Sequence, residues 1–154
     1  MRDNRFSSER ALSGLKDFQR KTVDYVFDQL YGAAETSRFL VADEVGLGKT
    51  LVARGVIAKA VEHLQDKVKR VDVVYICSNA VIASQNINRL NVSGANGFPI
   101  ATRLTYLPKQ VRALRKNKVN FISLTPGTAF DHARSRGGHA EERAILYRIL
   151  RDLP

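Results

Sequence analysis

The feature that most constrains the fold is a short apolar run followed by a glycine-bearing turn and then a helical pattern. It is the stretch FLVADEVGLGKTLVARGVI, residues 39–57, in which Gly46 and Gly48 precede Lys49 and Thr50. Glycines permit left-handed backbone angles and leave room for an anion, so that backbone N–H groups can converge on a phosphate. The helix that follows would point its positive end at the same place. The stretch therefore predicts a phosphate-binding loop, in which Lys49 reaches the β- and γ-phosphates and the Thr50 hydroxyl ligates Mg²⁺.

The loop departs from the general pattern G-x-x-x-x-G-K-[ST] at one position. Asp43 stands where that pattern has its first glycine. A solvent-facing turn that happens to contain Gly-Lys-Thr is the alternative interpretation. The order of strand, loop and helix favours a phosphate loop over such a turn.

The rest of the chain alternates between helical and strand-like segments. Alternation of this kind predicts an α/β fold with a parallel sheet and helices on both faces. Ligands in such folds bind at the carboxyl ends of the strands, so the loops after Ala42, Cys77 and Leu124 should share one edge. We expect helices at 15–31, 49–65, within 78–90, at 108–116 and at 141–153, and strands at 38–42, 71–77, 100–105 and 119–124.

Size and composition set further limits on the chain. With 154 residues it is expected to form about one domain, which we place at residues 15–154 behind a flexible segment of residues 1–14. No apolar run approaches the roughly 18 residues of a membrane span. Cys77 is the only cysteine, so no internal disulfide can form, and the cytoplasm is the expected location.

The net charge of +10 favours a polyanionic partner, of which nucleic acid is the commonest. A basic surface that serves only solubility is the alternative. A cluster of cations near the predicted helix at 108–116 leaves the same two interpretations open, a solvated face or a surface for nucleic acid or a partner. Its members are Lys109, Arg112, Arg115, Lys116 and Lys118.

The string ADEVGLGKT resembles motif I of superfamily 2 helicases and translocases. It is most similar to that of the Swi/Snf-type enzymes and related bacterial DEAD/DEAH-type helicases, where an acidic pair precedes the glycines. The resemblance implies a RecA-like P-loop NTPase that uses ATP and Mg²⁺. On this basis the expected nucleotide-binding residues are Gln19, Glu44, Val45, Gly46, Leu47, Gly48, Lys49, Thr50 and Leu51.

Upstream, LKDFQRKTVDYV resembles the Q motif of the same proteins. The resemblance implies that Gln19 hydrogen-bonds the adenine edge, and an amide can both donate to and accept from that edge. The alternative is that Gln19 is simply a polar residue on an amphipathic helix.

Two later stretches resemble motifs that contact the nucleic-acid backbone. CSNAVIASQNINRL is similar to motif Ia, which implies a role for Ser78 and Asn79, and FISLTPGTAF is similar to motif Ib, which implies one for Thr125 and Gly127. A helix cap at Ser78–Asn79 and a plain Pro-Gly turn are the structural alternatives.

No stretch of the sequence is a good match to the D-E-x-x box, which positions Mg²⁺ and the attacking water in these proteins. DHAR at 131–134 and EERA at 141–144 do not follow a predicted strand. We therefore expect the chain to be part of a first RecA-like lobe, lacking the box and the second lobe, that binds nucleotide without hydrolysing it efficiently.

Taken with the charge, the motifs predict the ATP-binding portion of an ATP-dependent helicase or translocase, with DNA favoured over RNA as its partner. Two other classes remain open. One is a nucleotide-binding or regulatory module that does not hydrolyse its ligand. The other is a basic nucleic-acid-binding domain with a vestigial loop, whose binding would be salt-sensitive and independent of Lys49.

Overall fold

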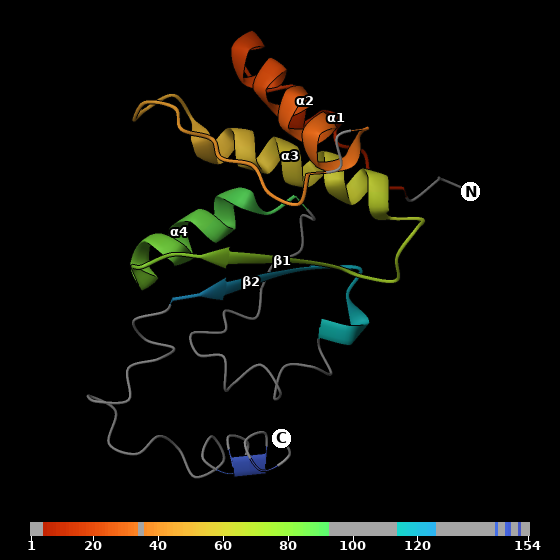
Figure 1. Ribbon diagram of the computed structural model, residues 1–154, viewed down its shortest axis with the longest axis vertical. Coiled ribbons are helices and arrows are strands. Elements are labelled where there is room, and N and C mark those ends of the chain that lie inside the picture. The colour runs from red at the N-terminus through yellow and green to blue at the C-terminus, as the bar shows by residue number, and fades with distance from the viewer. Residues whose placement is uncertain are drawn as a thin grey trace.

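The computed structural model describes residues 5–33, 36–92, 114–125, 144, 147–148 and 151. The predicted helices at 15–31, at 49–65 and within 78–90 are confirmed, as are the strands at 71–77 and 119–124. The expected strand at 100–105, most of the helices at 108–116 and 141–153, and Gly127 lie outside the described residues. The elements in chain order are α1 (Glu9–Leu12), α2 (Asp17–Tyr31), α3 (Lys49–Leu64), β1 (Val71–Ile76), α4 (Ala80–Leu90) and β2 (Val119–Leu124) (Figure 1).

The two strands form a parallel pair. Their register runs from Val71 opposite Val119 to Ile76 opposite Leu124, and the Cys77 N–H donates to the Leu124 carbonyl at 3.1 Å. The loops that follow β1 and β2 therefore leave the sheet side by side, as the alternating pattern predicts. Figure 1 shows that α3 begins on this same side of the molecule and runs back across the sheet.

The core lies between the sheet and α4. Ile87 and Leu90 of α4 and Phe121 of β2 are buried together, because the apolar positions of α4 recur at helical spacing on the side that faces the strands. Successive residues of a strand point to opposite faces, so Ile122 lies on the other face, where it packs against Leu114. In the part of the chain that the structure describes, α3 and α4 cover one face and a helical turn at 114–116 borders the other.

Helices α2 and α3 pack closely because α3 carries a glycine at their contact. A Cβ at Gly55 would lie 2.7 Å from Val23 Cγ2, a separation that real Cβ atoms do not reach. Val23 is fully buried as a result. Further along the same interface, Phe27 stacks on Tyr31 and meets the His63 ring edge-on.

The strand expected at 38–42 is wrong. No β-ladder includes these residues; Leu40 is 83 % exposed, and Phe39 packs edge-on against Tyr25 of α2. Sequence pattern can mark a segment as extended, but the segment becomes a strand only when a sheet edge accepts its hydrogen bonds. Strand β1 also differs from expectation, because Val74 and Ile76 are about half exposed instead of buried.

Helix α1 was not predicted from the sequence, because four residues are too few to show a periodicity. Its neighbourhood is fixed by contacts with the far end of α3. Ser8 Oγ donates to Glu62 at 2.6 Å, and the Phe6 backbone exchanges two hydrogen bonds with the Gln65 amide. These contacts join residues that are far apart in sequence, so no local pattern predicts them.

Candidate nucleotide-binding site

The loop before α3 has the backbone that anion binding requires. Gly46 has a φ of 92° and Gly48 a φ of 85°, both in the left-handed region that side chains disfavour. Gly48 caps α3, and its carbonyl accepts from the Leu51 and Val52 N–H groups at 2.8 and 3.1 Å. The N–H groups of the first two helical residues, Lys49 and Thr50, come before these bonds and have no partner within the helix, so they are available to an anion at this end.

The Lys49 side chain is held by the loop that precedes it. Its Nζ donates to the carbonyls of Asp43 and Glu44, at 2.8 Å in each case. An ammonium group carries three donors, so one remains for a phosphate oxygen. The acidic side chains of Asp43 and Glu44 are exposed, and it is their backbone that positions the cation.

Gln19 joins the start of α2 to the same loop. Its Nε2 donates to the Leu47 carbonyl at 3.0 Å, and its Oε1 accepts from the Lys16 N–H at 3.0 Å. The side chain is 5 % exposed, and a Cβ at Gly48 would come within 2.4 Å of Nε2. Gln19 therefore supports the phosphate loop directly, a contact that sequence reasoning did not anticipate. Its predicted contact with adenine stays a prediction.

A pocket of about 680 Å³ opens beside the loop. Its lining, as far as the structure describes it, holds three cations and no acid, so its field favours an anion. Two of these cations, Arg54 and Arg89, were not predicted. Arg54 could have been found, since it follows Thr50 by four residues and so shares its helix face, whereas Arg89 reaches the pocket from α4. The lining residues are Val45, Gly46, Gly48, Lys49, Thr50, Leu51, Arg54 and Arg89.

Comparison with protein families agrees with this geometry. The chain matches the DEAD/DEAH box helicase family over residues 17–150. It belongs to that family. No curated protein and no solved structure matches the chain significantly. Membership confirms the RecA-like α/β P-loop class and the superfamily 2 resemblance, and it indicates an ATP-dependent function of the helicase type.

The loop of this DEAD/DEAH box helicase fits the phosphates of ATP. A Cβ at Gly46 would meet nothing within 4 Å, so the backbone there faces open space where a phosphate can approach. Magnesium fits only in part. The Thr50 hydroxyl can supply one oxygen ligand, but no carboxylate lines the pocket among the residues that the structure places.

Three of the four residues predicted to contact nucleic acid, Ser78, Asn79 and Thr125, lie at the exits of β1 and β2. Ser78 and Asn79 are exposed. Asn79 also caps α4, because its Oδ1 accepts from the N–H groups of Val81 and Ile82 at 2.9 and 3.2 Å. Thr125 is only 4 % exposed, so its side chain does not face solvent. Gly127 lies outside the described residues.

Proposed function

We propose that this chain is the ATP-binding portion of a helicase or DNA translocase that couples ATP hydrolysis to movement on nucleic acid. The observation that carries the proposal is the loop before α3, where two glycines at positive φ precede Lys49. Membership of the DEAD/DEAH box helicase family supports it, because a helicase uses the nucleotide that it binds to act on nucleic acid.

In this proposal the chain binds ATP chiefly through its backbone. The free N–H groups at the start of α3 receive the phosphates, and the helix dipole adds to their attraction. Lys49 neutralises phosphate charge, with Arg54 and Arg89 nearby in the same pocket. Thr50 would hold Mg²⁺, which neutralises charge on the β- and γ-phosphates. Glu44, Val45, Leu47 and Leu51 complete the proposed nucleotide site.

Nucleic acid would lie across the edge where β1 and β2 end. Ser78 and Asn79 are exposed there, and short polar side chains are common partners of backbone phosphates. The net charge of +10 would add a salt-dependent attraction. The acidic pair before the glycines is the reason to propose DNA over RNA. No helix among the described residues is long and apolar enough to cross a membrane, and a cytoplasmic location is proposed.

The test is ATP turnover by the complete natural protein, measured with and without duplex DNA. We expect DNA to stimulate turnover and Lys49→Ala to abolish it. Lys69→Ala is the matched control, because Lys69 is an exposed lysine outside the pocket. ATP turnover that DNA does not stimulate, or that continues in the Lys49→Ala variant, would contradict the proposal.

A nucleotide-binding module without hydrolysis is the second candidate. One observation favours it: the described lining of the pocket offers no carboxylate to position Mg²⁺ or water. This candidate predicts that ATP binds with Lys49-dependent affinity while turnover stays at background with any nucleic acid. The same experiment therefore separates the two.

A further inference from the structure

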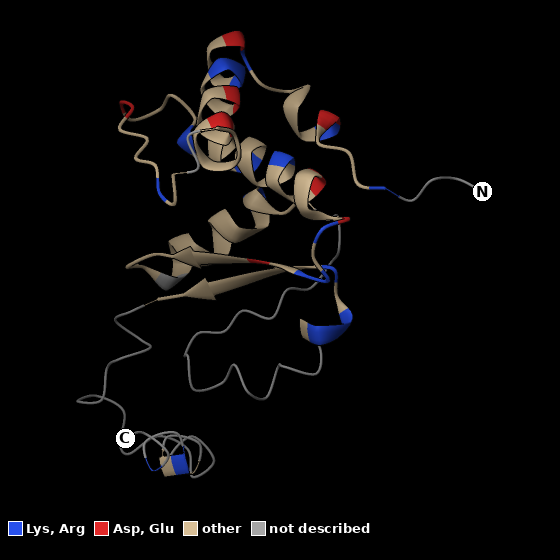
Figure 2. Ribbon diagram, turned by 45° about the vertical axis from the view of Figure 1, so that its right-hand side comes forward, with Lys and Arg blue, Asp and Glu red and all other residues tan. Residues whose placement is uncertain are grey.

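A second and larger pocket lies at the opposite edge of the sheet, where the strands begin. Its volume is about 910 Å³. Among the described residues, its walls come from four segments: the chain up to and including α1, α3 with the residues after it, the residues after α4, and the residues that lead into β2. Figure 2 shows lysines and arginines gathered where the chain enters β2. Strand β1 separates this pocket from the exits of the strands by roughly 17 Å, at about 3.3 Å per residue.

The pocket carries a strong excess of positive charge. Among the residues that the structure describes, five cations line it, namely Arg5, Arg10, Arg54, Lys116 and Lys118, against the single acid Asp66. Asp66 is already paired with Arg5, and Lys118 donates to the Val68 carbonyl. Within the described part of the chain, no acidic side chain pairs with Arg10, Arg54 or Lys116. Like charges gathered in a concave site repel one another unless an anion joins them.

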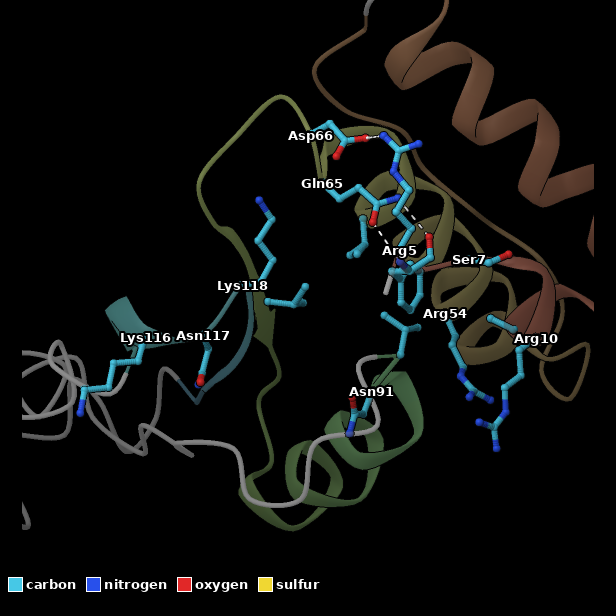
Figure 3. A pocket seen from close by; sticks show the side chains of 15 residues that line it. Arg5, Ser7, Arg10, Arg54, Gln65, Asp66, Asn91, Lys116, Asn117 and Lys118 are labelled. Atoms are coloured by element: carbon cyan, nitrogen blue, oxygen red, sulfur yellow. Dashed lines mark hydrogen bonds and ion pairs between the residues drawn. The ribbon is translucent and has the colours of Figure 1, made fainter. Parts of the chain in front are cut away.

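Arg54, which also lines the pocket beside the phosphate loop, provides a second observation. Its Nε is buried and has no hydrogen-bond partner, although buried donors are nearly always paired. Figure 3 shows Arg54 and Arg10 extending from one side of the pocket, with Lys116 and Lys118 on the other side and the Arg5–Asp66 pair at a third position on its rim. The cations thus surround the cavity from several segments.

We propose that this pocket binds a compact oligophosphate anion, at a site separate from the phosphate loop. Its volume lies within the range of roughly 300–1,000 Å³ that is common for small-molecule sites. Grooves that follow a nucleic-acid strand combine a track of cations with aromatic side chains on which bases stack. Here the cations lie on several sides of the cavity, and the one aromatic among the described lining residues, Phe6, is half-buried and tied through its backbone to Gln65. These features favour a free oligophosphate over a strand.

The proposal is tested with inorganic tripolyphosphate by titration calorimetry. The chain carries Lys49→Ala throughout, so that the phosphate loop contributes little. The test variant adds Arg10→Ala and Lys116→Ala, which remove two cations from opposite sides of the pocket. The control adds Lys21→Ala and Lys69→Ala, two exposed lysines outside both pockets, and so makes the same change in net charge. Arg54 is left in place because it lines both pockets.

We expect one tripolyphosphate per chain, at least about tenfold weaker binding in the test variant, and less than about a twofold change in the control. Three results would overturn the proposal. They are no binding, equal weakening in both variants, and tighter binding of a single-stranded oligonucleotide that is lost in the test variant alone. The last result would assign the pocket to a nucleic-acid backbone. A negative result in this test would not count against the proposed nucleotide site at Lys49, because Lys49 is replaced in every protein compared.

Discussion

Replacing Gly48 by alanine should disturb the phosphate loop through Gln19 as well as through the backbone. At a φ of 85° an alanine is strained, and left-handed angles cost an L-residue about 1–2 kcal/mol. The new Cβ would also lie 2.4 Å from Gln19 Nε2, so the amide must move. Moving it breaks the bonds to the Leu47 carbonyl and the Lys16 N–H, at about 1 kcal/mol each. The expected loss of unfolding free energy is therefore about 3–4 kcal/mol.

Gly46 offers a matched control for this substitution. Its φ of 92° imposes similar strain on an alanine, but a Cβ there meets nothing within 4 Å. Gly46→Ala should therefore cost only about 1–2 kcal/mol. Urea unfolding followed by circular dichroism measures both variants, provided that unfolding is two-state.

A double-mutant cycle then assigns the difference to Gln19. Gln19→Ala alone should cost about 2 kcal/mol, because it loses the same two hydrogen bonds. In the Gly48→Ala background it should cost almost nothing, which gives a coupling of about 2 kcal/mol. Equal destabilisation by the two glycine variants, or additive effects of Gln19→Ala and Gly48→Ala, would refute the reasoning.

Substitutions at three further positions test other parts of the account by urea unfolding or DNA binding. Gly55→Ala should destabilise the α2–α3 contact by up to about 2 kcal/mol, since overpacking against Val23 outweighs the gain in helix propensity; a more stable variant would show that the helices are not so close. Asn79→Ala should lose about 1 kcal/mol with the α4 cap, whereas Asn79→Asp should keep the cap and weaken DNA binding by charge repulsion; unchanged DNA affinity in Asn79→Asp would leave Asn79 with a structural role alone. Asn120→Ala should cost about 1–3 kcal/mol because the buried Asn120 amide bonds Asp72 and the Leu114 carbonyl; a smaller loss would mean that water replaces it.

Local pattern was sufficient to predict the glycine-bearing loop and the helix that follows it, although the strand expected before the loop was wrong. The glycines, Lys49 and the helix after them are consecutive in the chain, so their geometry follows from short-range chemistry. The bounds of β2 were predicted residue for residue, because the stretch Thr-Pro-Gly that follows Leu124 ends the strand. The helix after Ser78 and its cap were also anticipated, because the capping residue and the helix are adjacent in the chain.

What sequence could not show depends on contacts between distant segments. The bond from Gln19 to Leu47 spans 28 residues, and that from Phe6 to Gln65 spans 59. The wrong prediction of a strand at 38–42 has a related cause. The local pattern could not show that Phe39 would pack against Tyr25, which is distant in sequence. The basic pocket is assembled from four such segments, so cations that appear scattered in the sequence surround one cavity.

The central claim is that the loop before α3 binds ATP through Lys49, and its most direct test is the affinity of this chain for Mg-ATP. Lys49→Ala removes a charged donor to phosphate, worth about 1.5–3 kcal/mol, so affinity should fall by roughly 10- to 150-fold. The control Lys69→Ala, which alters net charge equally, should stay within about twofold of the unaltered chain. An affinity that is the same in all three proteins would contradict the account.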